Sequence, residues 1–383
     1  MFTLAKGEIT IEERKMILKM IEDGKITADE GLKLLEALQK DDNKDEPKAE
    51  VEEEKATEST DTQVSKVVDW EKGNDYKKTY KQPSGTTKFT DFIESAIQKI
   101  KEFDLDFNFG SHIEVDHIFQ HQNFSQAHID VSLENGSLNV VPWSSPDVRI
   151  ECKAKVYRVK DVEEARQVFL RETTFEPGEE KLRFATKVKS IKVNAVMYIP
   201  EQQYQNIKLY TFNGQIDGEK ITSEAFDVKT VNGSISIERA EVTKMYAETV
   251  HGPISLTGSR VERCEAKTMN GAVDLEGKMI NTDVETVNGT ITYELTNTDK
   301  PCYLDVKATT GSIRLTLPDN LKTEGKLKTN VGGFSCELPN LEVIEEKKEF
   351  AQKIMSFVSN KEAETKMTIT ADTKTGSISL RTQ

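Results

Sequence analysis

Apolar and polar residues alternate in short runs between Lys208 and Leu315, and the runs meet at a repeated phrase of the form Thr-Val-Asn-Gly-x-Ile. The glycines of the phrase fall at positions 214, 233, 252, 271, 289 and 311, so the steps between them are 19, 19, 19, 18 and 22 residues. Self-similarity at such a period is typical of stacked repeats. The pattern therefore predicts a repeat fold.

Alignment of the units on the asparagine separates buried columns from exposed ones. The positions four before, three after and five after the asparagine are apolar in almost every unit. They are Leu209, Val228, Ala247, Ala266 and Val284; Ile216, Ile235, Ile254, Val273 and Ile291; and Ile237, Leu256, Leu275 and Tyr293. This alternation predicts two short strands that flank each Asn-Gly corner and share one core.

Asn-Gly is also the strongest short signal for a β-hairpin turn, so a meander of antiparallel hairpins is the alternative. In a parallel coil, by contrast, like residues lie about 4.8 Å apart and form ladders, which explains why the units match residue for residue. Pro253 stands where a type I′ turn needs a backbone N–H donor, which proline lacks. We therefore expect a mainly β fold, a parallel β-solenoid of about 19 residues per rung, with a small N-terminal α-helical hairpin.

The repeated phrase itself is interpreted as a structural corner. Stacked side-chain amides are expected from Asn213, Asn232, Asn270 and Asn288, and a positive φ is expected at Gly214, Gly233, Gly252, Gly271 and Gly289. A second column is expected from Thr211, Thr230, Thr249, Thr268 and Thr286. His251 and Thr310 are expected to interrupt the asparagine ladder as tolerated variants.

Residues 8–40 have the pattern of a hairpin of two short helices. Thr10 with Glu13, and Thr27 with Glu30, have the spacing of a capping box, and Gly24 can end the first helix. A pair this small buries too little surface to be stable alone, so we expect it to dock on a partner, a second copy or the rest of the chain. A packed cap without a binding role is the alternative. The candidate partner-binding residues are Ile17, Met20, Ile21, Leu34, Leu35 and Leu38.

The next two segments differ sharply in composition. Residues 41–85 are acidic and poor in large apolar residues, which predicts a disordered linker. Residues 86–110 begin as an amphipathic helix and continue with a period-two alternation of Phe103, Leu105, Phe107 and Phe109. We expect this segment to cap the core of the β-domain; its mixed polar face is a weak match to an anionic membrane surface.

Residues 111–383 are expected to form one β-solenoid-like domain. Strands are predicted in AHIDVSLENGSLNVV, DVRIECKAKVYRV and IKVNAVMYIP, and one helix at about 161–172. Asn135-Gly136 resembles an early unit of the repeat, and the phrases at 328–334 and 374–378 are expected to lie in register with it, since Gly376 follows Gly333 after about two periods. The charged segment EVIEEKKEFAQKI is expected to be a loop or short helix that interrupts the stack.

Overall charge, cysteine content and the lack of a recognisable targeting segment bear on the partner and the location of the protein. The chain has 66 acidic and 52 basic residues and a net charge of -14, which argues against nucleic acid as a partner. Its four cysteines are scattered, and no targeting or membrane-spanning segment is recognisable. A cytoplasmic location is therefore expected, with association with the cell envelope as the alternative.

No constellation of catalytic residues stands out, so we expect no enzymatic activity and no cofactor. His112, His117, His121 and His128 are close in sequence, but on a strand His117 and His121 lie about 13 Å apart, too far to share a metal ion. His251 supplies only one ligand, so no metal is expected there either. The outward residues Ser236, Ser255 and Thr292 are small, and only Asp274 beside them is a carboxylate.

The helical hairpin EERKMILKMIEDGKITADEGLKLLEAL, the acidic linker, the segment IKEFDLDFNFG and the repeated VNGSI phrase together resemble a bacterial family. It is the adhesin-type domain of unknown function in its YvlB/LiaX-like form, with an N-terminal hairpin of the SHOCT-like kind. The resemblance implies a β-solenoid-like domain without known enzymatic activity and a link to the cell-envelope stress response of Gram-positive bacteria. It also implies a protein or envelope-active peptide as partner.

Three functions remain open from the sequence. The first is a non-enzymatic binding or regulatory scaffold, in which the β-domain presents a flat face and the tethered hairpin engages a partner. The second is a carbohydrate-active solenoid enzyme, which rests on fold analogy alone. The third is a structural protein that self-assembles through open stack ends, which leaves a homo-oligomer open.

Overall fold

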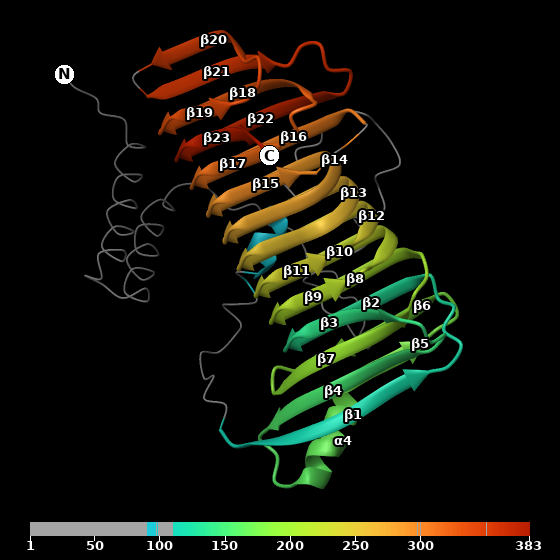
Figure 1. Ribbon diagram of the computed structural model, residues 1–383. Helices are drawn as coiled ribbons and strands as arrows, with labels where there is room; N and C mark the ends of the chain where they lie inside the picture. The colour runs from blue at the N-terminus through green and yellow to red at the C-terminus, as the bar shows by residue number, and fades with distance from the viewer. Residues whose placement is uncertain (1–89, 97, 99–109, 297, 299, 350) are drawn as a thin grey trace, which may run out of the picture. The chain divides into compact units, whose positions relative to one another are not determined.

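The computed structural model describes residues 90–96, 98, 110–296, 298, 300–349 and 351–383. The predicted hairpin at 8–40, with Ile17, Met20, Ile21, Leu34, Leu35 and Leu38, lies outside the described residues. The same holds for the predicted linker at 41–85 and for the phenylalanine alternation at 103–109. The described part is mainly β, as predicted, and its strands form a solenoid-like stack (Figure 1).

The strands pair side by side in two rows, with the hydrophobic core between the rows. The first row is here called the helix-side sheet, because the helical segment at 90–96 lies on its outer face. In space it runs as β5 (Thr173–Pro177), β6 (Lys181–Thr186), β2 (His128–Asn135), β8 (Tyr204–Asn213), β10 (Thr222–Asn232), β12 (Glu241–His251), the C-terminal parts of β13 (Ile254–Asn270) and β14 (Val273–Asn288), β16 (Cys302–Thr310), β22 (Lys366–Thr375), β18 (Lys322–Val331), β21 (Gln352–Ser359) and β20 (Glu342–Glu349). A repeat unit contributes one strand to each row.

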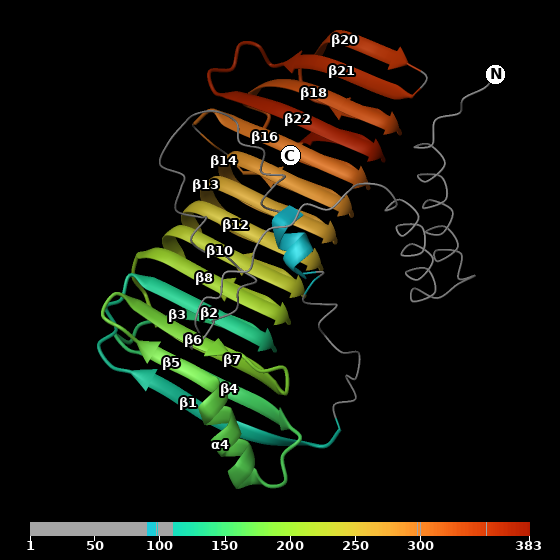
Figure 2. The same ribbon diagram turned by 180° about the vertical axis from the view of Figure 1, so that it is seen from behind.

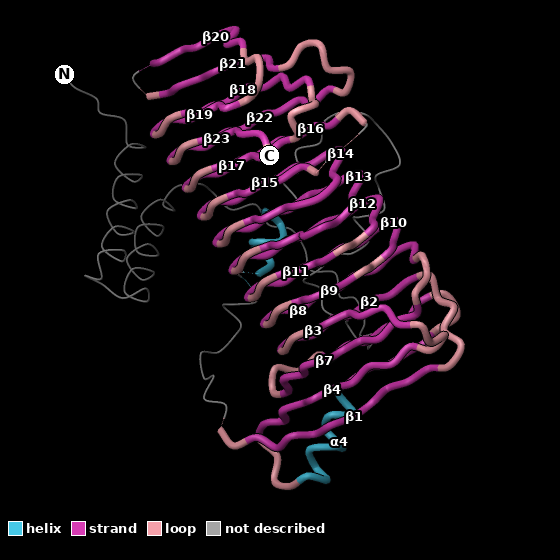
Figure 3. The backbone as a smooth tube through the Cα atoms, in the orientation of Figure 1, coloured by secondary structure: helices cyan, strands magenta, loops and turns pink. Residues whose placement is uncertain are grey.

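The second row, the opposite sheet, is formed mostly by shorter strands. It runs as β1 (His112–His121), β4 (Val148–Tyr157), β7 (Ile191–Pro200), β3 (Leu138–Trp143), β9 (Ile216–Glu219), β11 (Ile235–Glu238), the N-terminal parts of β13 and β14, β15 (Ile291–Leu295), β17 (Ile313–Leu317), β23 (Ile378–Thr382) and β19 (Phe334–Glu337). The corners between the two sheets follow one another in register along one edge (Figure 3).

Repeat strands pair in parallel with like residues opposite one another, so the hairpin alternative is wrong. Thr211 lies opposite Thr230, Thr230 opposite Thr249, and Thr249 opposite Thr268. The apolar columns four before, three after and five after the asparagine are all buried, as predicted. Inward positions alternate with outward ones because successive side chains of a strand point to opposite faces.

The two ends of the stack depart from sequence order. At the N-terminal end Asn135 pairs with Asn213, so the early Asn-Gly unit joins the repeat directly, as predicted. At the other end β22 lies between β16 and β18, and β23 lies between β17 and β19. Thr375 therefore pairs with Thr310 on one side and with Val331 on the other, so the phrases at 328–334 and 374–378 lie in register with the repeat, as expected, although they stack in the reverse of their sequence order.

One predicted loop is a strand pair. Residues 342–349 and 352–359 form the antiparallel hairpin β20–β21. The expectation of a loop or short helix at EVIEEKKEFAQKI is wrong because every residue of β20 is exposed, so its sequence carries no alternation of apolar and polar residues.

The predicted helix at 161–172 is confirmed as α4 (Val162–Glu172). The carboxylate of Asp161 caps it by accepting a hydrogen bond from the backbone N–H of Glu164 at 2.8 Å. Its Phe169 is buried and lies near the rings of His117 and Phe119 on β1. The helix thus covers the core at the N-terminal end of the stack (Figure 1).

Candidate functional site: the outer face of the helix-side sheet

The asparagines of the repeated phrase form a chain of hydrogen bonds along one corner. The side-chain N–H of Asn213 donates to Asn135 Oδ1 at 2.8 Å, that of Asn232 to Asn213 Oδ1 at 2.7 Å, and that of Asn288 to Asn270 Oδ1 at 2.8 Å. His251 takes part as well, because its Nδ1 lies 3.0 Å from Asn270 Nδ2 and can accept from it. The expectation that His251 interrupts the ladder is therefore wrong on the Asn270 side.

The threonine column is tied to the glycines of the neighbouring unit. The hydroxyl of Thr230 donates to the carbonyl of Gly214 at 2.9 Å, and Thr249 donates to the carbonyl of Gly233 at 3.0 Å. Equivalent bonds join Thr211 to Gly136, Thr268 to Gly252 and Thr286 to Gly271. Because these hydroxyls are buried, each one needs a hydrogen-bond acceptor within the protein, and the corner carbonyl of the neighbouring unit supplies it.

Loss of one such hydroxyl is expected to weaken the stack. In Thr249→Val the shape of the side chain is kept but the carbonyl of Gly233 loses its buried donor, so we expect a loss of about 1–2 kcal/mol of unfolding free energy. Urea unfolding of the full chain measures it. Thr249→Ser keeps the hydroxyl and serves as the control; an equal loss in both variants would show that the hydrogen bond is not the cause.

Close packing, rather than a positive φ, requires most of the repeat glycines. Among the predicted set only Gly252 has a positive φ, of 152°, so the expectation is wrong for Gly214, Gly233, Gly271 and Gly289. A Cβ atom at Gly233 would lie 2.0 Å from the carbonyl oxygen of Gly214, and the other glycines of the set would meet a neighbouring carbonyl at 1.9–2.0 Å. The corner is thus filled by backbone and offers no room for a ligand.

The outer face of the helix-side sheet carries charged rows that our sequence reasoning missed. Three positions before the asparagine, basic and acidic side chains alternate on seven neighbouring strands. The row, here called the charge ladder, is Lys229, Glu248, Lys267, Glu285, Lys307, Asp372 and Lys328. The alternation of charges is visible in the same alignment of repeat units as the apolar columns. Residues at one repeat position lie side by side when the strands pair in parallel, so opposite charges at that position become neighbours in space.

Part of the charge ladder is buried and paired. Lys229 Nζ lies 2.8 Å from Glu248 Oε2 and 4.0 Å from Asp227 Oδ1, and Lys267 Nζ lies 3.6 Å from Glu265 Oε2. The side chain of Lys267 is only 2 % exposed. Charged groups are seldom buried to this degree unless they are paired, so the pairs hold this face in one arrangement.

The environment shifts the proton affinities of these groups. Burial raises the pKa of Asp227 to about 6, although Lys229 opposes the shift. Burial also opposes the charge on Lys229, but the nearby Asp227 and Glu248 outweigh it and raise its pKa. Burial likewise raises the pKa of Asp283 further along the sheet. Neutralisation of Asp227 between pH 4 and 7 would thus change the charge balance of this face.

An apolar row next to the charge ladder is covered by a helical segment at 90–96. The helix lies on the sheet near β10 and β12 (Figure 2). Its Phe92 and Ala96 are buried against Tyr210, Phe212, Val231 and Val250 of β8, β10 and β12. Lys229 Nζ lies 5.6 Å from the centre of the Phe92 ring, within the range of a cation–π contact. The helix therefore packs on the outer face in the middle of the stack, and the expectation that it caps the core of the domain is wrong.

Removal of the Phe92 ring is expected to release this segment without unfolding the sheet. For Phe92→Ala we expect amide exchange at 90–96 to accelerate at least about tenfold, because the remaining apolar contact is small. Hydrogen exchange followed by mass spectrometry measures it. Glu94→Ala, on the exposed side of the same helix, is the control and should leave the exchange rates nearly unchanged.

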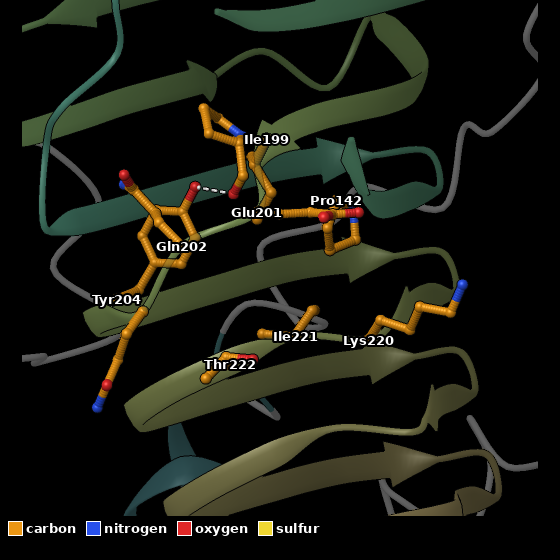
Figure 4. Close-up of a pocket in the computed structure, with 10 residues that line it drawn as sticks. Pro142, Ile199, Glu201, Gln202, Tyr204, Lys220, Ile221 and Thr222 are labelled. Atoms are coloured by element: carbon orange, nitrogen blue, oxygen red, sulfur yellow. Dashed lines mark hydrogen bonds between the residues drawn. The ribbon is translucent and has the colours of Figure 1, made fainter. Parts of the chain in front are cut away.

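A separate cavity of about 430 Å³ opens where the chain passes from β7 to β8 (Figure 4). Ile199, Ile221 and Tyr204 provide apolar surface, and the Tyr204 hydroxyl donates to the carbonyl of Pro200 at 2.9 Å. Glu201 and Lys220 are the charged residues of the lining. The lining contains no histidine or cysteine.

The clustered histidines lie on two strands, and none of the four cysteines is paired with another. His112, His117 and His121 lie on β1, a strand as expected, and burial lowers the pKa of His117. No group of three or more metal-ligating side chains occurs among the described residues. The four cysteines are free thiols. In the described part of the chain, no helix has the length and apolar character needed to cross a membrane.

Comparisons with known proteins agree with the resemblance drawn from the sequence. The family model described as Toastrack DUF4097 matches residues 126–381, and that of a SHOCT-like domain matches residues 12–43. The "Uncharacterized protein YvlB" of Bacillus subtilis (strain 168) is 44% identical over 371 residues, which are 97% of this chain and 98% of that relative.

Two solved structures show a more distant likeness. A "putative adhesin" from Bacteroides fragilis has a TM-score of 0.40 at 10% identity and covers 70% of this chain and 97% of its own. A "putative cell adhesion protein" from Clostridium sporogenes has a TM-score of 0.23 at 9% identity and covers 71% of this chain and 100% of its own.

Proposed function

Since the chain belongs to the Toastrack DUF4097 family, we propose that it is a non-enzymatic binding and regulatory scaffold in the response of a bacterial cell to envelope stress. The observation that carries the proposal is the outer face of the helix-side sheet beyond the segment 90–96, where Lys307, Asp372 and Lys328 of the charge ladder are about one-third to one-half exposed. A regular parallel sheet holds such rows at fixed spacing, which suits recognition of an extended surface rather than chemistry on a small substrate.

In this proposal the two parts of the chain have different tasks. The β-domain, built from rungs of about 19 residues, presents the face, and the SHOCT-like segment at 12–43 folds as a helical hairpin that engages the partner. The apolar side chains Ile17, Met20, Ile21, Leu34, Leu35 and Leu38 would make the contact. The partner is a protein or an envelope-active peptide, and the protein acts in the cytoplasm or at the cell envelope.

Binding measured with matched variants tests both tasks. We would capture partners from cells with and without envelope stress, using the full chain and a chain that begins at residue 86. Stress-dependent capture by the full chain, lost without residues 1–85, is the expected result. Equal capture by both would remove the hairpin from the proposal.

A second pair of variants tests the face. Lys307→Glu reverses a half-exposed charge in the charge ladder, whereas Arg314→Glu reverses an exposed charge on β17 of the opposite sheet. We expect capture to fall with the first and to persist with the second. The reverse outcome would place binding on the opposite sheet.

A further inference from the structure

One end of the strand stack is covered by a helix, whereas the other ends in an exposed edge strand. At the N-terminal end α4 packs on β1 and β4 and buries Phe169. At the other end the helix-side sheet stops at β20, which among the described residues pairs only with β21. All eight residues of β20 are exposed, and Ile344 and Val343 are 67% and 49% exposed. An edge strand of this kind has unpaired backbone N–H and C=O groups that a further strand can use.

The charges of β20 favour one arrangement of a second, identical strand. In an antiparallel pair about a two-fold axis through Glu346, each Glu345 lies opposite Lys347 of the other copy. The two Glu346 side chains then face each other, but Lys348 lies 2.7 Å from Glu346 in its own strand and diagonal to Glu346 of the other copy. This register has two pairs of opposite charge and one of like charge.

The neighbouring register is less favourable. With the axis through Lys347, the two Lys347 side chains would face each other, and Glu345 would lie opposite Glu349 on both sides. Two favourable pairs between Glu346 and Lys348 would then compete with three pairs of like charge. Opposite and like charges at facing positions differ in sign but are similar in size, so the register centred on Lys347 is disfavoured. Axes through Glu345 and Lys348 also give two opposite pairs and one like pair, but the first places its Glu342–Lys348 pairs beyond the bulge at Ile344, and the second pairs only residues 347–349 of β20. The register centred on Glu346 is therefore the one that uses the regular part of the strand.

We propose that β20 is a self-association edge, through which two copies of this chain pair antiparallel about a two-fold axis at Glu346. This inference does not depend on the proposed binding function. Charged edge strands with bulges often prevent pairing, and β20 has a bulge at Ile344. The bulge lies at the end of the strand, however, and leaves residues 345–349 in regular register. A contact this short belongs to the small, transient interfaces, so the dimer is weak and concentration-dependent.

Charge reversal on the full chain tests the register. Sedimentation velocity over a wide concentration range should show a reversible monomer–dimer equilibrium. Glu345→Lys and Lys347→Glu each place like charges opposite one another twice, so we expect each to weaken dimerisation roughly tenfold. The double variant restores opposite charges and should restore the dimer. In the register centred on Lys347, by contrast, Glu345→Lys would strengthen it.

Glu241→Lys and Arg260→Glu, an exposed ion pair in the middle of the stack, make the same charge changes away from the edge and should leave dimerisation unchanged. Thermal melting checks that every variant is folded. The proposal is overturned if the chain stays monomeric throughout, if the double variant fails to recover, or if oligomers grow steadily with concentration, because head-to-tail association does not close at a dimer.

Discussion

Gly233→Ala should destabilise the protein by about 3–5 kcal/mol, among the largest effects expected of a single methyl group. The added Cβ would lie 2.0 Å from the carbonyl oxygen of Gly214 and 2.5 Å from its carbonyl carbon. Both are backbone atoms held by the corner hydrogen bonds, among them that from Thr230. Neither can move without separating two rungs, so the strain cannot be relieved locally. Urea unfolding monitored by circular dichroism measures the loss.

Gly333→Ala is the matched control. Gly333 ends the same kind of corner, but a Cβ there would meet nothing within 4 Å, and its φ is not in the positive range. We expect a change within about 0.5 kcal/mol. If Gly233→Ala were equally mild, the close approach of successive corners would not be the reason for glycine in the repeat.

The second large effect is expected from Lys229→Met. This change leaves Glu248 and Asp227 without their shared cation, and the side chains of these two acids are only 8% and 22% exposed. Removal of one member of a buried ion pair is costly, and we expect a loss of about 3 kcal/mol at pH 7.5. Lys307→Met, on the same charge ladder but half exposed, should cost less than about 1 kcal/mol.

The cost of Lys229→Met should depend on pH in a defined direction. The folded-state pKa of Asp227, about 6, lies above its ordinary value of 3.8, and loss of Lys229 raises it further. As the pH falls through this range, the folded state binds a proton before the unfolded state does, so the penalty of the buried charge is relieved. The difference from the wild type should shrink by at least about 1 kcal/mol between pH 7.5 and 5. A constant difference would exclude Asp227 as its source.

Several features could be predicted because they repeat. The apolar columns, the parallel pairing and the side-by-side asparagines recur unit after unit, and each unit is an independent observation of the same environment. The charge ladder was equally accessible at the position three before the asparagine. Its significance becomes clear only when the parallel register is known, because Lys229 and Glu248 are 19 residues apart in sequence but lie opposite each other in the sheet.

Features that do not repeat were predicted less well. β22 lies between β16 and β18, against the order of the sequence, and no local pattern of apolar and polar residues indicates that order. The exposure of β20 removed the alternation that identifies strands. The helical segment at 90–96 was expected from its apolar face, but that face alone could not indicate which surface it covers.

The sequence by itself determined a mainly β, parallel repeat domain and its family, because repeated burial of like residues leaves a periodic record in the chain. Only the tertiary structure decided why the repeat glycines are required, how the ends are completed and where the outer face is charged, apolar or open. These properties arise from contacts between residues of neighbouring rungs, and such contacts depend on the order in which the strands stack. The repeated Asn-Gly phrase fixes the corner, whereas the surfaces that can bind lie between the corners.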